Sequence, residues 1–380
     1  MRRGSTGEYE IRTIAGEQVR AFVPHPLPPS PALKISSASQ RLLEQATLAV
    51  GRLDSISLLL PDPNIFLYAY VRREAVLSSQ IEGTQSSLAD LLLFELDEAP
   101  GTPLDDVIEV SGYVAALEHG MARLRDGFPL SNRLLREMHQ VLLARGRGSD
   151  KSPGEFRHTQ NWIGGTRPGN ASFVPPPPDQ VHACMAALER FIHDEDTPYP
   201  VLLAAALAHV QFETIHPFLD GNGRMGRLLI AFILHHGQVL TSPLLYLSLF
   251  FKQHRSDYYR LLDEVRATGD WEAWVDFFLE GVASTASNAV GTAQRLVALF
   301  KEDAARVQSV GRSASSAIRV FNVLCQRPVI TLNELSDHIG LSFPTASKSI
   351  NALSDLGIVR ELTGGRRNRI FAHTLSGHPQ

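Results

Sequence analysis

The sequence predicts a mainly α-helical protein, and two observations support this prediction. Apolar residues recur at spacings of three and four through most of the first 300 residues, which is the period of a helix with one buried face. Breaks rich in proline and glycine separate these segments, most clearly at residues 61–64 and 99–103. The composition, 44% apolar and 20% charged, is that of a globular chain able to bury a core.

The elements follow in order along the chain. Residues 1–35 are proline-rich near their end, and we expect an extended arm without a packed core. The spacing then predicts helices over residues 42–60, 65–77, 87–94, 104–124, 132–143, 179–194, 201–215, 224–235, 254–268 and 271–300. Residues 151–178 interrupt this pattern with Gly, Asn, Ser, Thr and Pro, and a loop of this length inside a compact domain is usually functional or disordered.

The character of the chain changes near residue 313. Residues 313–380 carry seven Lys or Arg and four Asp or Glu, a balance of +3 in a chain whose formal charge is −4. Three predicted helices, over residues 316–325, 331–339 and 342–356, precede predicted strands at 358–362 and 370–373. This order resembles a winged helix-turn-helix, and the candidate DNA contacts are Lys348, Arg366, Arg367 and Arg369. The alternative is a module that binds protein or dimerises.

Composition also limits the cellular setting. A formal charge of −4 gives no overall field that would attract nucleic acid or an anionic membrane. No apolar run approaches the roughly 18 residues of a membrane span, and no signal peptide is expected. The two cysteines, Cys184 and Cys325, lie far apart without metal-ligand neighbours, so we expect reduced thiols and a cytoplasmic protein.

The most informative stretch is residues 212–227, FETIHPFLDGNGRMGR. Pro217 disfavours helical geometry at His216, so a helix is expected to end there. The Asp-Gly-Asn-Gly turn at residues 220–223 can direct successive backbone N–H groups into one concavity suited to phosphate. It leads directly into a predicted helix, whose N-terminus adds free donors and partial positive charge.

The side chains of this stretch complete a set suited to phosphoryl or nucleotidyl transfer. Arg224 and Arg227 are three residues apart and can face the same anion. Asp220 offers a hard oxygen ligand for Mg²⁺, and His216 can accept a proton near neutral pH. An isolated Asp-Gly-Asn-Gly is usually only a tight turn, but a tight turn alone does not explain all of these features within twelve residues.

This stretch resembles the signature of the Fic family, His-Pro-Phe-x-(Asp/Glu)-Gly-Asn-Gly-Arg-x-x-Arg, at every specified position. The resemblance implies a Fic-like helical core with a short β-hairpin flap. It also implies transfer of AMP from ATP, with Mg²⁺, to a Ser, Thr or Tyr hydroxyl of a target protein. His216 would be the catalytic base, Asp220 the metal ligand and Phe218 a structural anchor. The nucleotide-binding residues would be Gly221, Asn222, Gly223, Arg224, Met225, Gly226 and Arg227, with Tyr258 and Tyr259 near the adenosine.

Two further segments resemble Fic proteins. Residues 154–177 are similar to the flap, which offers an extended edge to the main chain of the target; the alternative is an ordinary proline-rich loop. Residues 78–83 resemble the inhibitory motif (Ser/Thr)-x-x-x-Glu-(Gly/Asn). That resemblance implies that Glu82 pairs with Arg227, misaligns ATP and autoinhibits the enzyme. The alternative is an exposed glutamate at a helix end, before a glycine C-cap.

These observations predict an N-terminal helical region with the inhibitory motif at residues 1–105. A Fic catalytic domain follows at 106–300 and a winged helix-turn-helix domain at 313–375. The expected partners are a target protein, with self-modification and a homodimer also allowed, and DNA through the winged helix. Two rival functions stay open. One is transfer of UMP, phosphate or phosphocholine, and the other is a DNA-binding regulator whose Fic domain acts as a sensor.

Overall fold

The computed structural model describes residues 2–14, 16–59, 63–95, 104–327, 329–363 and 369–374. Its contacts define two compact units. The first comprises Met1–Asp54, Val71–Leu88 and Gly101–Ser287, and the second comprises Ser55–Tyr70, Ala89–Pro100 and Asn288–Gln380. Helices dominate both units, which confirms the mainly α fold class.

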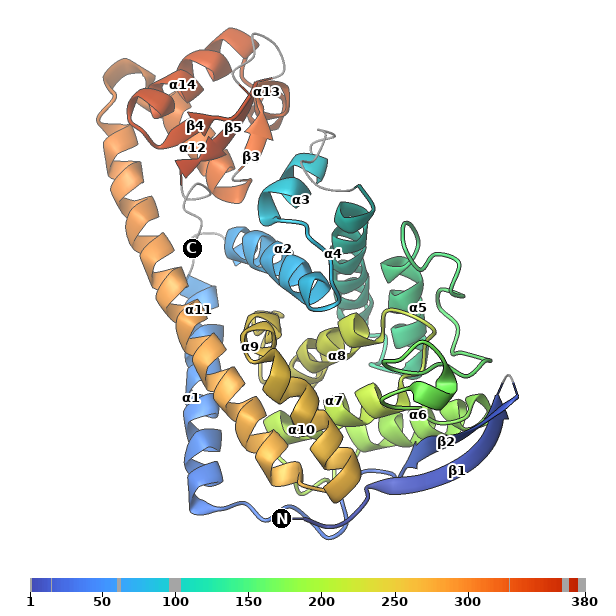
Figure 1. Ribbon diagram of the computed structural model, residues 1–380. Helices are drawn as coiled ribbons and strands as arrows, with labels where there is room; N and C mark the ends of the chain where they lie inside the picture. Colours follow the sequence, from blue (N-terminus) through green and yellow to red (C-terminus); the bar gives the residue numbers. More distant parts are fainter. Residues whose placement is uncertain are drawn as a thin grey trace. The chain divides into compact units, whose positions relative to one another are not determined.

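The helices up to residue 308 agree well with the periodicity of the sequence (Figure 1). They are α1 (Ser37–Leu59), α2 (Pro63–Ile81), α3 (Leu88–Glu95), α4 (Leu104–Arg125), α5 (Asn132–Leu142), α6 (Pro178–Ile192), α7 (Val201–Ile215), α8 (Asn222–His236), α9 (Ser248–Gln253), α10 (Arg255–Thr268) and α11 (Trp271–Gln308). The short helix α9 was not predicted, because six residues are too few to display a helical period. Within the described residues, no helix is both long enough and apolar enough to cross a bilayer.

Helices α7 and α8 form the centre of the first unit. Nearly every residue of both is buried, so each is packed on all sides rather than along one stripe. The indole of Trp274 on α11 donates a hydrogen bond to the carbonyl of Ala206 on α7, 2.9 Å away. The turn between α7 and α8 is therefore attached at both ends to fully packed helices, which suits a site that must hold a fixed geometry.

The prediction of an extended N-terminal arm is wrong. Residues Gly7–Ile14 (β1) and Glu17–Pro24 (β2) form an antiparallel hairpin in which Tyr9 faces Phe22. Phe22 is fully buried, so this segment does contribute to a packed core. The physical reason is the alternation of side chains on both sides of Gly16, a hairpin pattern that the proline-rich stretch after it obscured.

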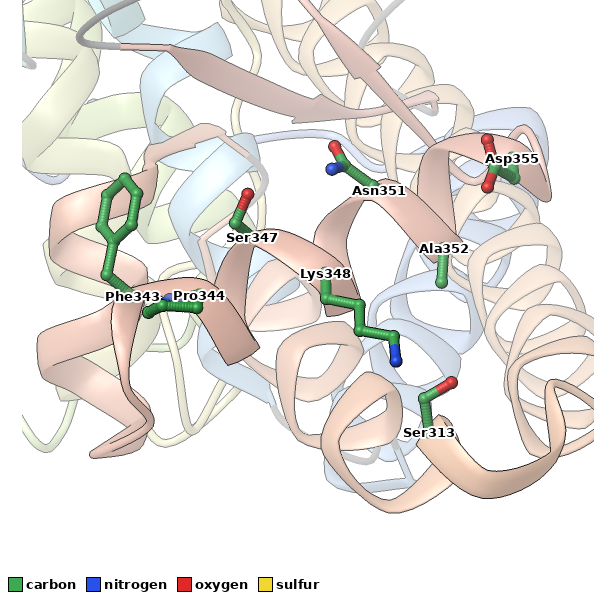
Figure 2. Close-up of a pocket in the computed structure, with 8 residues that line it drawn as sticks. All are labelled: Ser313, Phe343, Pro344, Ser347, Lys348, Asn351, Ala352 and Asp355. Atoms are coloured by element: carbon green, nitrogen blue, oxygen red, sulfur yellow. The ribbon is translucent and has the colours of Figure 1, made fainter.

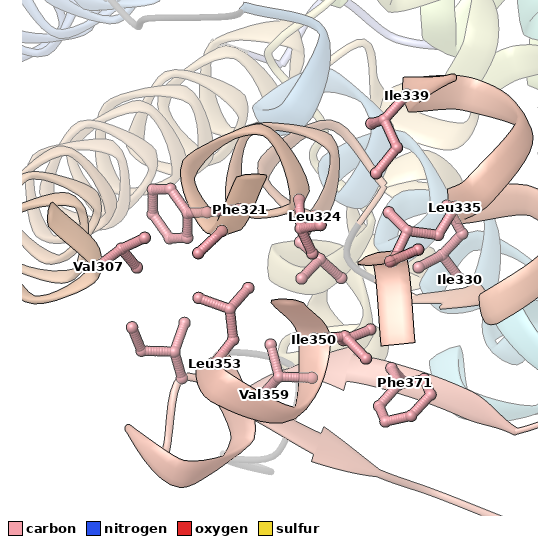
Figure 3. Packing of buried hydrophobic residues seen from close by; sticks show 14 of the residues in the cluster. Val307, Phe321, Leu324, Ile330, Leu335, Ile339, Ile350, Leu353, Val359 and Phe371 are labelled. Carbon is pink, nitrogen blue, oxygen red and sulfur yellow. The ribbon is translucent and has the colours of Figure 1, made fainter. Parts of the chain in front are cut away.

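The C-terminal part of the second unit has the predicted winged-helix topology. Its elements are α12 (Ala314–Gln326), β3 (Val329–Thr331), α13 (Leu332–Ile339), α14 (Phe343–Asp355), β4 (Val359–Glu361) and β5 (Ile370–His373), with strand order β3-β5-β4. Buried residues of the helices and strands form one core, in which Phe321, Ile350 and Phe371 take part (Figure 3). The predicted capping box begins α13, because Thr331 and Glu334 each accept a hydrogen bond from the other's backbone N–H. The three-residue strand β3 was not predicted.

Candidate active site

The candidate catalytic turn, residues 216–221, begins where α7 ends. His216 takes a left-handed conformation, with φ of 50°, and its N–H still donates to the carbonyl of Phe212 at 2.9 Å. Pro217 follows, so the chain leaves the helix at this point, as the sequence predicts. Gly221, with φ of 75°, precedes the first residue of α8, a conformation that favours glycine. The turn therefore connects the end of one buried helix to the start of the next.

Side chains within and beside the turn hold it in place. The amide of Asn222 accepts a hydrogen bond from the Phe218 N–H at 2.9 Å and donates one to the Phe218 carbonyl at 2.8 Å. The buried ring of Phe218 stacks on His139, with centroids 3.7 Å apart. Nδ1 of His139 accepts from the Gly154 N–H, so its Nε2 carries the proton and donates to the carbonyl of Asp220 at 3.0 Å. Because the Asn222 side chain is engaged in the turn, only its backbone N–H is available to an anion.

Arg157, near the start of the flap segment at residues 154–177, connects the turn after α7 to the end of that segment. Its buried guanidinium donates to the carbonyls of His216 at 2.9 Å and Pro176 at 2.6 Å. Its own N–H donates to the carbonyl of Pro217 at 2.9 Å. Burial lowers the pKa of Arg157 to about 10, which still leaves it charged at neutral pH. A fixed positive charge therefore lies beside the backbone of the candidate base.

This environment keeps the His216 imidazole neutral. Burial, with the positive charge of Arg157 as the next cause, lowers the pKa of His216 to about 4. The imidazole is therefore unprotonated throughout the physiological pH range. An unprotonated imidazole at the mouth of a turn can accept a proton from a hydroxyl group.

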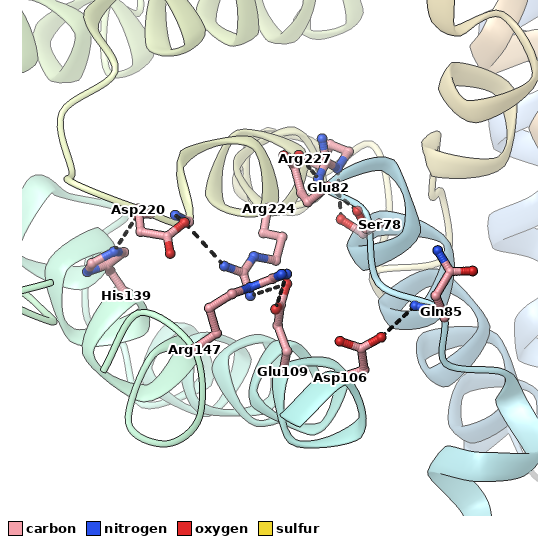
Figure 4. Close-up of polar contacts among 11 residues, drawn as sticks. Ser78, Glu82, Gln85, Asp106, Glu109, His139, Arg147, Asp220, Arg224 and Arg227 are labelled. Carbon is pink, nitrogen blue, oxygen red and sulfur yellow. Dashed lines mark hydrogen bonds and ion pairs between the residues drawn. The ribbon is translucent and has the colours of Figure 1, made fainter. Parts of the chain in front are cut away.

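The first arginine of the motif is held by a residue that the sequence analysis missed. Glu109 on α4 is buried and lies between two guanidinium groups (Figure 4). Its Oε1 is 3.0 Å from Nη1 of Arg224, and its Oε2 accepts from Nη2 of Arg147 at 2.6 Å. Burial raises the pKa of Glu109, and the two arginines oppose that rise. Glu109 thus fixes where Arg224 lies.

The second arginine of the motif, Arg227, is held by the end of α2. It donates to Oγ of Ser78 at 2.7 Å, to the Ser78 carbonyl at 3.0 Å and to Oε1 of Glu82 at 2.7 Å (Figure 4). Burial alone would raise the pKa of Glu82, but the charge and hydrogen bond of Arg227 outweigh it and lower the pKa. The Glu82 side chain remains 33% exposed. A carboxylate just beyond a helix C-terminus is unfavourable by itself, so Arg227 is its stabilising partner.

The Glu82 carboxylate also lies over the start of α8. A Cβ built on Gly223 would come within 2.2 Å of Oε1 of Glu82 and 3.1 Å of Nη1 of Arg227. Gly223 belongs to the first turn of α8, where backbone N–H groups lack helical partners. The carboxylate therefore sits at a helix N-terminus, the kind of position that favours a phosphate group.

Two further buried carboxyl groups lie near Arg227. Glu74, two turns before Glu82, accepts hydrogen bonds from the hydroxyl groups of Tyr113 and Ser248. Glu213 is buried on α7, one turn before His216. Burial raises the pKa of Glu74 and of Glu213 to about 7 in each case. Both are therefore partly protonated near neutral pH, which leaves Glu82 as the main anionic partner of Arg227.

Asp220 and the rest of the motif take different positions. One carboxylate oxygen of Asp220 accepts from the Gly221 N–H at 2.6 Å, and its side chain is partly exposed. Met225 is fully buried, and a Cβ on Gly226 would lie 2.3 Å from Glu213, so both serve helix packing. Among the described residues, no three His, Cys, Asp or Glu side chains are grouped so as to hold a metal ion.

The two candidate adenosine contacts differ in environment. Tyr258 is buried, and its hydroxyl pairs with Nε2 of His209 at 2.9 Å. Nδ1 of His209 lies 3.0 Å from the carbonyl of Gly226, so Tyr258 supports the backbone of the motif through His209. Tyr259 is 41% exposed, and burial together with the charge of Glu82 raises its pKa. Of the two, Tyr259 is therefore accessible to a ligand.

The flap is a very short hairpin. The N–H of Ile163 donates to the carbonyl of Phe173 at 2.8 Å, and the reciprocal bond is 3.1 Å long. Asn161 donates from its side chain to the carbonyl of Phe218 at 2.9 Å, which joins the start of the flap to the catalytic turn. Trp162 is 38% exposed. These contacts agree with the predicted β-hairpin flap in the fold class.

Comparison with known families gives three matches. Residues 40–122 match the N-terminal domain of the Fic/DOC family, residues 129–234 match the Fic/DOC family itself, and residues 316–360 match winged helix-turn-helix DNA-binding domains. These three ranges include the C-terminal end of α2 with Glu82, the turn between α7 and α8, and helix α14 of the winged helix.

Comparison with individual proteins agrees. The chain is 31% identical over 209 residues to the protein adenylyltransferase Fic of Drosophila melanogaster, and 33% identical over 206 residues to that of Culex quinquefasciatus. These alignments cover 54% and 53% of this chain, but the chain spans only 39% and 38% of those relatives.

Two solved structures share the fold. A Fic family protein from Desulfovibrio desulfuricans G20 has a TM-score of 0.61 at 21% identity, covering 93% of this chain and 100% of its own. Fic-1 from C. elegans has a TM-score of 0.55 at 22% identity, covering 69% of this chain and 74% of the solved chain.

Proposed function

The chain belongs to the Fic/DOC family, and we propose that it is an adenylyltransferase that moves AMP from ATP to a hydroxyl side chain of a target protein. The observation that carries this proposal is the turn from His216 to Arg227. It combines a neutral imidazole, a helix N-terminus and two guanidinium groups within one turn and one helix. The named activity of the insect relatives supports the same reaction.

The chemistry follows from these groups. The hydroxyl oxygen of the target attacks the α-phosphorus of ATP while His216 accepts the hydroxyl proton. The bond from that phosphorus to the bridging oxygen breaks, and pyrophosphate leaves. Arg224 and Arg227 would hold the outer phosphates, whose charge grows as the bond breaks, and the first N–H groups of α8 would bind the α-phosphate. Tyr259 is the accessible tyrosine for the adenosine.

The residues present fit a Mg²⁺ ion bound mainly through the substrate. Asp220 keeps one carboxylate oxygen beyond the one that accepts from Gly221, and its side chain is partly exposed. One carboxylate is sufficient for Mg²⁺, which usually takes its remaining ligands from phosphates and water. When bound, the ion would neutralise charge on the phosphates of ATP.

We propose further that Glu82 autoinhibits this reaction. Its carboxylate accepts from Nη2 of Arg227 and lies over Gly223, where phosphate oxygens would otherwise bind. ATP would then bind with its phosphates displaced, and transfer would be slow because in-line geometry is lost. The predicted division at residues 1–105 and 106–300 places this glutamate in a regulatory region that acts on the catalytic one.

DNA binding through the winged helix is a second proposed function. The outer face of α14 forms a groove lined by Phe343, Ser347, Lys348 and Asn351 (Figure 2). Lysine and asparagine are side chains that read base edges in a major groove. Of the predicted wing contacts, Arg369 donates to Glu361 at 2.6 Å, while Arg366 and Arg367 lie outside the described residues. The proposal therefore rests chiefly on α14 and on the family match of residues 316–360.

The remaining proposals concern setting and partners. The thiols of Cys184 and Cys325 are both free, which fits a reducing compartment such as the cytoplasm. A hydroxyl on a second copy of the chain could serve as acceptor, which would give self-modification within a homodimer.

ATP labelled on either the α- or the γ-phosphate tests the proposed reaction. Incubation of the purified protein, alone and with a cell extract, should transfer label to protein only from the α-labelled ATP. Transfer of the γ-label would instead indicate phosphorylation. No transfer of either label, even by the Glu82→Gly variant, would favour the regulator without catalytic activity.

A further inference from the structure

The N-terminal hairpin of β1 and β2 lies before both Fic-matched ranges, residues 40–122 and 129–234. It nevertheless contacts the flap directly. The N–H of Phe22 on β2 donates to the carbonyl of Val174 at 2.9 Å, so β2 is hydrogen-bonded to the flap at that point. Val19 and Ala21 pack against Val174 in a small apolar cluster. One edge of the flap is therefore already occupied by this chain.

A second contact holds the tip of the flap. Glu17, at the start of β2, forms an ion pair with Arg167 and accepts from the N–H of Gly169 at 3.0 Å. A Cβ on Gly169 would lie 2.4 Å from Oε2 of Glu17, so a side chain there would displace the carboxylate. The hairpin thus binds both the base and the tip of the flap.

The other end of the hairpin is fixed to the body of the unit. The Arg3 side chain donates to both carboxylate oxygens of Glu272, at 2.7 and 2.5 Å, and the N–H of Thr6 donates to the carbonyl of Arg266 at 3.2 Å. The Arg266 guanidinium in turn lies 4.1 Å from the ring centroid of the flap residue Phe173. The hairpin therefore connects the flap tip to the C-terminal end of α10 and the N-terminal end of α11, and these contacts would oppose movement of the flap.

From these contacts we propose that the hairpin is a brace that sets the position of the flap for the incoming target. Because β2 covers the edge at Val174, an extended target segment can add only along the opposite edge, from Asn161 to Gly164. That edge is joined to the catalytic turn through the hydrogen bond from Asn161 to the Phe218 carbonyl. The brace thereby fixes the distance between the bound target and His216, and acts on target binding rather than on ATP. This inference rests on the proposed AMP transfer.

Glu17→Ala tests the brace by amide hydrogen exchange, a measurement that needs no activity. The Ile163 and Phe173 amides, which do not touch Glu17, should exchange roughly two- to fivefold faster, the range expected for a partly exposed ion pair. Glu17→Gln keeps an acceptor for the Gly169 N–H and should give an intermediate rate. Glu8→Ala, an exposed carboxylate on the same hairpin, is the matched control and should leave both amides at the parental rate. Parental exchange of Ile163 and Phe173 in Glu17→Ala overturns the brace.

AMP transfer tests its consequence for the target. With a His216→Ala copy of this chain offered as acceptor, Glu17→Ala should raise KM for the acceptor about two- to fivefold and leave KM for ATP unchanged. An equal change in both KM values would mean that Glu17 stabilises the fold in general and does not act specifically on binding of the target. If neither the parental protein nor Glu82→Gly transfers AMP in any assay, the proposed function fails, while the exchange experiment still decides whether the hairpin braces the flap.

Discussion

Replacing Glu82 by glycine should raise the rate of AMP transfer. Of the three hydrogen bonds that Arg227 donates to Ser78 and Glu82, only the one to Glu82 pairs opposite charges. A hydrogen bond to a charged group contributes about 1.5–3 kcal/mol. Because the Glu82 side chain is 33% exposed, solvent screening reduces this to about 1–2 kcal/mol, or roughly a 5- to 30-fold rise in rate.

The assay is the initial forward rate from ATP labelled on the α-phosphate. Glu82→Gln, which keeps an acceptor without its charge, should fall between the parent and Glu82→Gly. Glu82→Gly/Arg227→Ala should show no rise, because Arg227 is itself needed to hold the phosphates. Arg73→Ala, an exposed change on the same helix, serves as the control. If Glu82→Gly is as slow as the parent or slower, the inhibitory role is refuted. Initial rates are compared because, if Glu82 also assisted removal of AMP from the target, its loss would increase the accumulated product without any change in the forward rate.

Three other predictions concern the proposed base His216, the buried carboxyl group of Glu74, and the arginines Arg366 and Arg367 of the winged helix. His216→Ala should lower the rate of AMP transfer at least about 100-fold while ATP binding is retained. Because the His216 pKa is about 4, the parental rate should not fall as the pH is lowered through 6.5. A variant as fast as the parent, or a fall in the parental rate near pH 6.5, would show that His216 is not the base. Folding raises the Glu74 pKa from 4.5 to about 7, so the unfolded chain releases this proton first and the folded state loses stability as pH rises between these values. Glu74→Gln should flatten that loss by up to about 3 kcal/mol in urea unfolding, and an unchanged slope would contradict it. Arg366→Ala/Arg367→Ala should weaken DNA binding and flatten its salt dependence without altering catalysis, and a parent that binds no DNA at low salt would exclude the regulator function.

The sequence predicted the helices and the catalytic turn because their signals are local. Helical spacing needs only neighbouring residues, and the motif is continuous from His216 to Arg227. Glu109 and His139 could not be found in this way. Each lies 80 or more residues from its partner in the motif and belongs to an otherwise ordinary helix, so only the packing of α4 against α8 and of α5 against the turn reveals its contact.

The hairpin is a different kind of omission. Its alternation on either side of Gly16 was readable, but the proline-rich residues after it pointed to an extended arm. Tyr9 and Ile11 of β1 are exposed, while Ala21 and Phe22 of β2 are buried, so the two strands carry unequal burial and the pattern is weak. The hairpin packs against the flap, which lies about 150 residues later in the chain, and a pattern of neighbouring residues cannot predict a contact at that separation.

Gly223 constrains how this protein can change by single mutations. Any side chain there would collide with the Glu82 carboxylate at 2.2 Å, and it would equally crowd an anion at the same helix start. A substitution at this position would therefore displace the Glu82 carboxylate, but it would also obstruct the proposed binding site of the ATP phosphates. Single mutations that produce a hyperactive form should instead be found in α2 and at Glu82, so random selection for gain of activity would return changes clustered on that helix end.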